Sequence, residues 1–385
     1  MKWVALMPLR AGSKSIRDKN IRLIAGRPLF SWSLGEAVAS GVFDDIYVAS
    51  DSERVRRTVA GEFPSGVEII DRSAESASDT ASTEAVMLEF QQRVKFDVVC
   101  LIQATSPLTR ADDFISARRQ FESESLDSLL SAVRSKRFIW SADADALNYT
   151  PRSRPRRQDF EGSYIENGAF YFTAADILAQ ERCRLGGRIG IHVMPADTEL
   201  ELDDPTDWPI VETALRKRLR TESLIEALDR VKIFVIDVDG TLTDGSMYYG
   251  PDGEAFKQFH TRDGKGLERL RDVGVRVCVM TGEDSPTTAA RMKKLGISDY
   301  FAGVSDKLSL LEEKAAAWSV SLDEVAFIGD DLGDLECLSA VAASFCPSDA
   351  VARIKTATAC ICSSPGGEGA VREACDRIYA AKAGE

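Results

Sequence analysis

The sequence predicts an α/β protein with two domains, each built around a mostly parallel β-sheet. The chain has 385 residues, which is more than one domain usually contains. Apolar runs of strand length alternate with amphipathic helical stretches, as in sheets whose strands are connected by helices. This alternation starts again after a helical stretch that ends at residue 230. We therefore expect two Rossmann-like domains, at residues 1–228 and 229–385, joined without a linker rich in Gly, Pro or Ser.

The elements of the first domain follow from six apolar runs. These runs predict strands at Trp3–Pro8, Asp45–Ala49, Val67–Ile70, Asp97–Ile102, Ser128–Ala132 and Ala169–Phe172. Apolar side chains recur at helical spacing at Leu29–Ala39, Ala111–Phe121 and Trp208–Arg230.

In the second domain the same signals predict strands at Lys232–Ile236, Val275–Met280, Tyr300–Phe301 and Glu324–Ile328. Its predicted helices are Gly264–Val273, Pro286–Leu295 and Leu308–Trp318.

The composition excludes several classes of function. A formal net charge of −13 argues against a nucleic-acid partner. No apolar run reaches the roughly 18 residues that a membrane span needs. The first four residues do not have the pattern of a secretion signal, so we expect a cytoplasmic protein. Only two histidines, His192 and His260, are present, which leaves acid–base and metal chemistry to carboxylates.

An acidic turn follows the first strand of the second domain. The apolar run Val231–Ile236 leads directly into Asp237-Val-Asp239-Gly240-Thr241. This order places one carboxylate as a nucleophile and the next within reach of a phosphoryl group and its Mg2+. The alternative is a plain turn, since aspartate and glycine favour turns. The full string D-x-D-G-T-L-T is more specific than that and predicts a phosphate-handling site.

A basic loop follows the first strand of the first domain. It contains Arg10, Gly12, Ser13, Lys14, Lys19 and Asn20. Backbone N–H groups in such a loop bind phosphate oxygens, while the cations neutralise a triphosphate. The Walker pattern G-x-x-x-x-G-K-[ST] is absent from it. Taken alone, the loop is equally compatible with a solvated basic surface.

Five motifs follow this loop in order. They are Arg72–Ser82, Leu101–Arg110, Arg156–Asp159, Glu166–Phe172 and Glu201–Trp208. With these motifs, residues 1–220 closely resemble the acylneuraminate cytidylyltransferases (CMP-sialic acid synthetases). The strings R-P-R-R-Q-D and D-W-P-I are similar to those of the animal enzymes. The resemblance implies attack by the anomeric oxygen of a nonulosonic acid on the α-phosphorus of CTP, with release of pyrophosphate.

The resemblance also implies roles for individual residues. The nucleotide would be held by Arg10, Ser13, Lys14, Lys19, Asn20, Arg72, Ser78 and Ser82. The sugar acid would meet Gln103, Arg157 and Asn167. Glu201 and Asp203 would bind Mg2+; the family usually has Asp-x-Asp here, so Asp204 or Asp207 is an alternative to Glu201. The arginines around Arg157 also fit a nuclear-localisation signal, should the source be a eukaryote.

The residues after 230 resemble the cap-less phosphatases of the haloacid dehalogenase superfamily, typified by the 3-deoxy-octulosonate 8-phosphate phosphatases. This resemblance implies that Asp237 is the nucleophile and Asp239 the acid–base residue, with Thr281 and Lys307 at the phosphoryl group. The Mg2+ ligands would be Asp237, the backbone carbonyl of Asp239, and Asp330, with Asp331 or Asp334 beside them. Arg262 and the loop at 366–372 would face a sugar phosphate, partly across the subunits of a homotetramer formed through this domain.

Two interpretations of the second domain stay open. In the first, the chain is bifunctional: it removes phosphate from a sialic acid 9-phosphate and then activates the product with CTP. In the second, the domain only holds a tetramer together, as the degenerate domain of animal synthetases does. The intact motifs around Asp237 and Lys307 favour the first. Either version can also act on a related sugar, such as a deaminated nonulosonate or an octulosonate.

Overall fold

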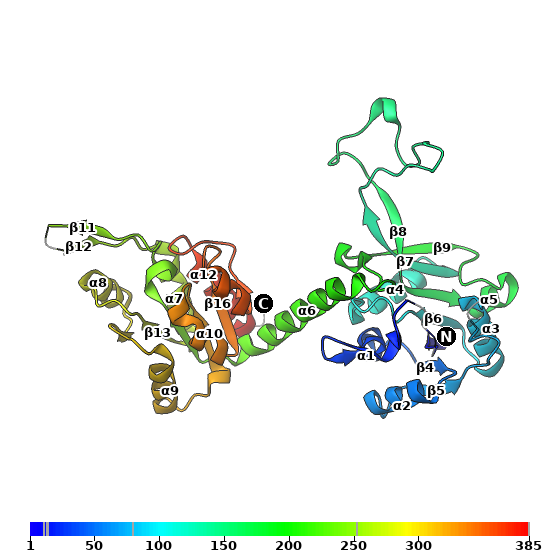
Figure 1. The fold of residues 1–385 in the computed structure, drawn as a ribbon, viewed down its shortest axis with the longest axis horizontal. Coiled ribbons are helices and arrows are strands. Elements are labelled where there is room, and N and C mark those ends of the chain that lie inside the picture. The colour runs from blue at the N-terminus through cyan, green and yellow to red at the C-terminus, as the bar shows by residue number, and fades with distance from the viewer. Residues whose placement is uncertain (11, 13–14, 79–80, 252, 384–385) are drawn as a thin grey trace. The chain divides into compact units, whose positions relative to one another are not determined.

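The computed structural model describes residues 1–385 except 11, 13–14, 79–80, 252 and 384–385. The chain divides into two compact units, Met1–Arg216 and Lys217–Glu385 (Figure 1). This division lies inside helix α6 (Asp207–Arg230), whereas the sequence-predicted boundary after residue 228 lies near the end of the same helix. None of the helices among the described residues combines the length and the apolar character that a membrane span requires.

The N-terminal unit contains a seven-stranded sheet in the order β5-β4-β1-β6-β8-β7-β9. Its strands are β1 (Trp3–Pro8), β4 (Asp45–Ser50), β5 (Glu68–Asp71), β6 (Val98–Ile102), β7 (Ser128–Ser135), β8 (Ser163–Ala174) and β9 (Ile189–Met194). Neighbouring strands are parallel except where β8 pairs antiparallel with β6 and β7. The predicted mostly parallel α/β sheet is confirmed. A separate small ribbon is formed by β2 (Leu23–Ile24) and β3 (Arg27–Pro28).

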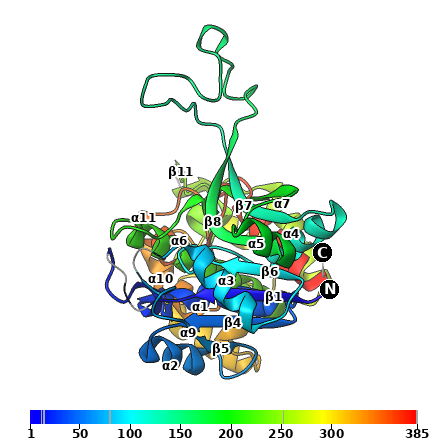
Figure 2. The same ribbon diagram turned by 90° about the vertical axis from the view of Figure 1, so that its right-hand side faces the viewer.

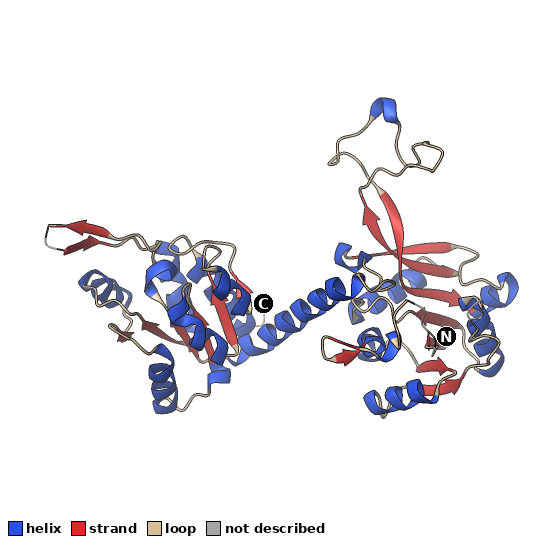
Figure 3. Ribbon diagram, viewed as in Figure 1, coloured by secondary structure: helices blue, strands red, loops and turns tan. Residues whose placement is uncertain are grey.

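Helices cover both faces of this sheet (Figure 3). They are α1 (Leu29–Ser40), α2 (Glu53–Glu62), α3 (Thr83–Arg93), α4 (Ala111–Ser123) and α5 (Ala175–Glu181). One core joins the odd-numbered side chains of β1, such as Trp3 and Met7, to α1, α2 and α4. The other joins Val4 and Leu6 to α3 and α5. Alternate residues of a strand point to opposite faces, so an apolar strand such as β1 is buried on both sides.

An arm extends from the ends of β7 and β8. Residues 136–162 leave the sheet as a long excursion, which both views show pointing away from the rest of the unit (Figures 1 and 2). The arm has an aromatic centre, in which the Phe138 ring lies 4.4 Å from that of Tyr149 and 4.9 Å from that of Phe160. The guanidinium of Arg154 lies 4.4 Å from the centroid of the Phe138 ring. Aromatic packing therefore gives the arm local order away from the main core.

The C-terminal unit contains a six-stranded parallel sheet in the order β14-β13-β10-β15-β16-β17. Its strands are β10 (Ile233–Ile236), β13 (Arg276–Met280), β14 (Asp299–Phe301), β15 (Val325–Ile328), β16 (Ala343–Cys346) and β17 (Cys360–Ile361). Its helices are α7 (Thr261–Asp272), α8 (Pro286–Leu295), α9 (Lys307–Ala317), α10 (Leu335–Ala340), α11 (Ala352–Ala357) and α12 (Ala370–Ala383). Helices α7, α8 and α12 cover one face, and α9, α10 and α11 the other. A hairpin of β11 (Tyr248–Gly250) and β12 (Gly253–Phe256) is an addition to this layered plan.

A buried carboxylate joins α7 to α12. Asp263 is 1% exposed, and its Oδ1 accepts the backbone N–H of Arg372 at 2.9 Å. Burial raises the pKa of Asp263 from its ordinary 3.8 to about 6. Between these two values the folded chain binds more protons than the unfolded chain, so this group makes stability fall as the pH rises. The stability that protonated Asp263 contributes is fully lost once the pH exceeds about 6.

We expect Asp263→Asn to remove this pH dependence, because the amide oxygen still accepts from Arg372 and the side chain no longer ionises. Thermal unfolding of the wild type and of Asp263→Asn from pH 4 to pH 8 measures this pH dependence. The Tm of the variant minus the Tm of the wild type should rise with pH and level off above pH 6. A difference that is constant across this range would show that Asp263 does not titrate there.

Candidate active sites

A cavity of about 550 Å³ lies where β1 and β6 of the N-terminal unit end. Parallel strands carry their following loops to the same edge of a sheet, which is where α/β proteins bind ligands. The sequence-predicted residues that line this cavity are Arg10, Lys19, Asn20, Arg72, Ser78, Gln103 and Asp203. Ser82 is the N-cap residue of α3, directly before Thr83 in the cavity wall. Ser13 and Lys14 lie outside the described residues.

Two predicted sugar-acid residues lie elsewhere. Arg157 is exposed on the arm, where its backbone carbonyl accepts from Lys136 Nζ at 3.5 Å. Asn167 is 1% exposed, and its amide donates to the carbonyl (3.2 Å) and the hydroxyl (3.1 Å) of Thr198. Asn167 therefore holds the segment that precedes Glu201. The cavity lining includes neither residue.

Lys19 and Asp203 meet at one side of the cavity, and the carboxylate of Glu201, which does not line it, is close enough to interact with both charges. Lys19 Nζ lies 3.0 Å from the carbonyl oxygen of Leu202 and 3.4 Å from Asp203 Oδ1. Burial, followed by the charges of Asp203 and Glu166, raises the pKa of Glu201, while Lys19 opposes the shift. The Glu201 carboxylate covers Gly168, where a Cβ atom would lie only 2.6 Å from Oε1. Glu201 and Asp203 thus face a shared region in which a cation would relieve their repulsion.

The alternative ligand Asp207 has another role. Its Oδ2 accepts the backbone N–H groups of Asp203 (3.0 Å) and Asp204 (2.7 Å) at the start of α6. This carboxylate orders the turn that presents Asp203. Asp204 is exposed at the surface of the turn.

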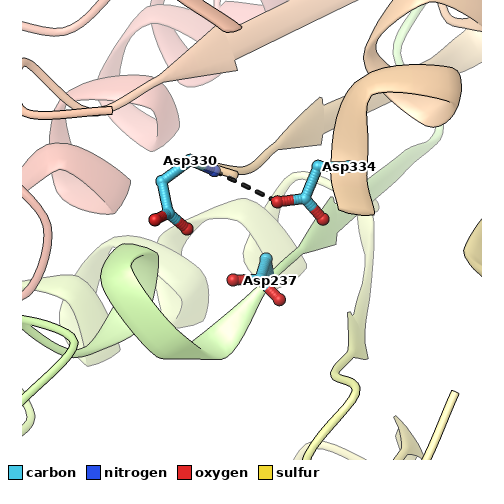
Figure 4. Close-up of side chains that lie close together, drawn as sticks. All are labelled: Asp237, Asp330 and Asp334. Atoms are coloured by element: carbon cyan, nitrogen blue, oxygen red, sulfur yellow. Dashed lines mark hydrogen bonds between the residues drawn. The ribbon is translucent and has the colours of Figure 1, made fainter. Parts of the chain in front are cut away.

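The second candidate site lies where β10 and β15 of the C-terminal unit end. Asp237 follows β10, and Asp330 and Asp334 follow β15, so the three carboxylates converge (Figure 4). One oxygen from each lies within 4.8 Å of the others. Asp334 Oδ2 accepts the backbone N–H of Asp330 at 3.1 Å, which fixes the turn between them. Three carboxylates at this spacing are the oxygen-rich set that Mg2+ prefers.

Lys307 supplies the positive charge of this site. Its Nζ, at the start of α9, donates to Asp237 Oδ1 and to Asp334 Oδ1, both at 2.6 Å. Although burial disfavours the ammonium, the two carboxylates raise the pKa of Lys307. Burial and then Asp334 raise the pKa of Asp237, and burial is also the main cause that raises the pKa of Asp330 to about 6. One cation is therefore too little for three carboxylates, of which Asp237 and Asp334 are buried and Asp330 is partly buried, and a divalent ion would balance them.

Asp239 has a partner that the sequence did not predict. Lys257, just after β12, has a side chain that is 0% exposed and an Nζ 2.6 Å from Asp239 Oδ1. Asp239 Oδ2 is buried and has no hydrogen-bond partner among the described residues. An oxygen that is free to accept or donate a proton is what an acid–base role requires.

Of the two residues predicted beside the metal ligands, Asp334 is 2% exposed and pairs with Lys307. Asp331 is exposed and caps the turn that follows it.

Thr281 and Arg262 occupy different surroundings. Thr281 is 2% exposed after β13, and its hydroxyl accepts the backbone N–H of Glu283 at 3.2 Å. Arg262 is exposed and lines a separate cavity of about 520 Å³ together with Arg372 and the loop before α12. Thr281 follows β13 and Asp237 follows β10, which are neighbouring strands of one sheet. Arg262 is not part of the group of three carboxylates.

A glycine allows the carboxylates to converge. Gly240 has φ +83°, and a methyl group at its Cα would collide with the carboxylate of Asp330. We expect Gly240→Ala to displace Asp330 and to abolish whatever activity depends on the carboxylate group, besides about 1–2 kcal/mol of backbone strain. Gly245→Ala is the matched control, because φ there is +73° but the nearest atom to its Cβ lies at 3.6 Å. Phosphate release and Tm of both variants measure the difference; equal losses would mean that strain alone is responsible.

Comparison with known proteins identifies the N-terminal unit. A family model described as cytidylyltransferase matches residues 4–213. N-acylneuraminate cytidylyltransferase A of Danio rerio is 31% identical over 388 residues, which cover 98% of this chain and 89% of that protein. The chain belongs to the cytidylyltransferase family. The cavity that contains Lys19 and Asp203 lies within the matched residues of this cytidylyltransferase.

The C-terminal unit of the cytidylyltransferase has relatives of its own. A second family model, described as haloacid dehalogenase-like hydrolase, matches residues 302–373. The 3-deoxy-D-manno-octulosonate 8-phosphate phosphatase of Haemophilus influenzae is 39% identical over 157 residues, 41% of this chain and 87% of that protein. The solved cobalt-bound form of such a phosphatase from H. influenzae covers 41% of this chain and 92% of its own, at 39% identity and a TM-score of 0.40. This cytidylyltransferase therefore carries a phosphatase-like domain of the haloacid dehalogenase type.

Proposed function

We propose that the chain is a bifunctional enzyme. Its N-terminal site would transfer CMP from CTP to a nonulosonic acid, and its C-terminal site would hydrolyse the phosphate ester that precedes this acid. The observation that supports both activities is the presence of two separate groups of cations and carboxylates, one around Lys19 and Asp203 and one around Asp237 and Lys307. The two reactions are consecutive, because the second site produces the free sugar acid that the first site uses.

In the first reaction, the anomeric oxygen of the sugar acid attacks the α-phosphorus of CTP and pyrophosphate leaves. Arg10, Lys19 and Arg72 line one cavity and would neutralise the triphosphate as charge shifts to the leaving group. Glu201 and Asp203 would hold Mg2+ against the same phosphates. Of the three residues predicted to meet the sugar acid, Gln103 lines this cavity. Arg157 stays a prediction, as does the direct role of Asn167.

In the second reaction, the Asp237 carboxylate attacks the phosphorus of the sugar phosphate and forms an aspartyl-phosphate. Asp239 protonates the leaving oxygen, then takes a proton from the water that hydrolyses the intermediate. Lys307, 2.6 Å from Asp237, opposes the effect of burial on the pKa of the nucleophile, orients its carboxylate and would balance the charge of the phosphoryl oxygens. Thr281 would contact the phosphoryl group through its hydroxyl and its N–H.

A metal ion fits the second site. Asp237, Asp330 and Asp334 offer carboxylate oxygens within 4.8 Å, and the backbone carbonyl of Asp239 would add a fourth ligand. Bound Mg2+ would stabilise the negative charge that develops on the phosphoryl oxygens. We expect chelation with EDTA to abolish phosphate release and Mg2+ to restore it. In the absence of substrate, Mg2+ should also raise the Tm of the wild type and not that of Asp330→Asn.

A module that only supports a tetramer is the second candidate for the C-terminal unit. The Lys307 ion pairs and the Asp239–Lys257 pair favour catalysis, since scaffolding requires neither buried charge. The homotetramer itself stays a prediction, which analytical ultracentrifugation can test.

A substrate panel tests the proposed function and identifies the sugar. Purified protein is incubated with Mg2+ and either a nonulosonate 9-phosphate or an octulosonate 8-phosphate, and phosphate release is measured. The corresponding free sugar acids are then incubated with CTP, and pyrophosphate release is measured. We expect the same carbon skeleton to be preferred in both assays, because one product is the other substrate. No phosphate release from any sugar phosphate would contradict the phosphatase proposal, and no CTP-dependent release would contradict the transferase proposal.

A further inference from the structure

The loop that leads into the nucleotide cavity is held from behind by one carboxylate. Residues 72–78 follow β5, and both Arg72 and Ser78 line the cavity. The turn has few backbone hydrogen bonds of its own, such as Ala77 N–H to Ser73 O at 3.0 Å. Glu89, a partly buried residue of helix α3, contacts this loop and does not line the cavity.

Glu89 accepts hydrogen bonds from two serines of this loop. Its Oε1 accepts the backbone N–H of Ser73 at 3.1 Å. Its Oε2 accepts the hydroxyl of Ser73 at 2.8 Å and that of Ser76 at 2.5 Å. Ser76 is 4% exposed and the Glu89 side chain 16% exposed, so these bonds are shielded from water. Burial disfavours the carboxylate, yet the hydrogen bonds from Ser76 and Ser73 lower the pKa of Glu89.

Ser76 links Glu89 to Arg72, because it forms hydrogen bonds with both side chains. Arg72 Nε donates to the Ser76 hydroxyl at 3.4 Å, and Arg72 Nη2 donates to the Ser76 carbonyl. Arg93, one turn after Glu89, pairs with it at 2.5 Å and donates to the carbonyl of Asp71 at 2.6 Å. Glu89 therefore connects the end of β5, the loop and the guanidinium that faces the cavity.

We propose that Glu89 is a positioning residue for the nucleotide subsite, which holds the loop so that Arg72 points at the triphosphate. This inference rests on the proposed assignment of Arg72 to CTP. A cation fixed before binding loses less rotational freedom when the nucleotide arrives, so its contribution to affinity is larger. The sugar-acid side of the cavity has other supports, such as Asn167 with Thr198, and does not depend on Glu89.

The test is steady-state kinetics of Glu89→Ala, with the KM for CTP, the KM for the sugar acid, kcat and Tm all measured. We expect the KM for CTP to rise about tenfold, which corresponds to about 1.4 kcal/mol, with the KM for the sugar acid unchanged. Glu89→Gln should give an intermediate value, because its amide keeps one acceptor oxygen. Glu122→Ala is the control: Glu122 forms a similar i,i+4 ion pair with Arg118 on α4, remote from the loop, and should leave both KM values as they are.

A double-mutant cycle distinguishes positioning from general destabilisation. If Glu89 acts through Ser76, the effects of Glu89→Ala and Ser76→Ala on the KM for CTP should not add. An unchanged KM for CTP in Glu89→Ala, beside a raised one in Arg72→Ala, would overturn the inference while the nucleotide assignment stands. Equal losses at both substrates with a lower Tm would overturn it as well. If Arg72→Ala itself leaves the KM for CTP unchanged, the subsite is assigned wrongly and the inference falls with it.

Discussion

Asp237→Asn should lower phosphate release at least about a thousandfold and leave CTP-dependent pyrophosphate release unchanged. The asparagine has the same shape as the aspartate but offers no carboxylate oxygen to attack phosphorus. It also leaves Lys307 paired with Asp334, so the site keeps its second 2.6 Å contact. Because burial already disfavours the charged form of Asp237, we expect the folded state to tolerate the neutral side chain. Both assays are carried out on the same preparation.

The control for this variant is Asp331→Asn. Asp331 directly follows Asp330 in the loop after β15, but it is exposed and lies outside the group of three carboxylates. The Asp331→Asn variant should retain phosphatase activity. Equal phosphate release from Asp237→Asn and the wild type would disprove the nucleophile assignment. Loss in both variants would show only that the site is sensitive to the neutralisation of a nearby carboxylate.

Lys19→Ala and Asp203→Ala should each lower CTP-dependent pyrophosphate release about a hundredfold or more. Lys19 is a buried cation at the cavity, with its side chain 12% exposed and its Nζ 3.4 Å from Asp203 Oδ1. Removing the lysine leaves the phosphate charge unbalanced, and removing the aspartate takes away a ligand for Mg2+. Phosphate release from the sugar phosphate should be unaffected in both variants.

Arg17→Ala is the control for the basic loop. Its side chain is 96% exposed in the same segment, and it does not line the cavity. We expect wild-type pyrophosphate release, because an exposed cation contributes little to a bound ligand that it does not contact. If both Lys19→Ala and Asp203→Ala remain active, the transferase centre lies elsewhere in the unit.

Much of the fold could be predicted because buried parallel strands are continuous apolar runs. The strand at Trp3–Pro8 was predicted with the observed bounds. Strand β8 begins at Ser163 and not at Ala169: its first four residues, where the chain returns from the arm, are partly or fully exposed and do not form an apolar run. Strand β9 has buried positions only at every second residue, and Gly190 and His192 interrupt its apolar pattern. Neither the antiparallel direction of β8 nor the arm has a local signal in the sequence.

The convergence of the candidate phosphate-binding residues was easier to predict than that of the candidate sugar-binding residues. Carboxylates and lysines in motifs follow strands, so the sheet itself brings Asp237 and Asp330 together. Lys257 had no such signal: a single lysine between Phe256 and Gln258 is typical of a surface position, and only the structure shows Asp239 2.6 Å away. Glu89 is similar, since its partners Ser73 and Ser76 lie in a loop whose path no helical pattern defines.

Helix α6 determines where the chain can be cut so that its two units, and the two proposed activities, are studied separately. Leu224, Ala227 and Leu228 of its second half belong to the core of the C-terminal unit, while Trp208 of its first half lies against Arg22. A cut at residue 228 would remove three core side chains from the phosphatase-like unit and expose them on the other fragment. Fragments that both retain residues 207–230 should each fold, and mixing them would show whether the free sugar acid passes through solution between the two catalysts.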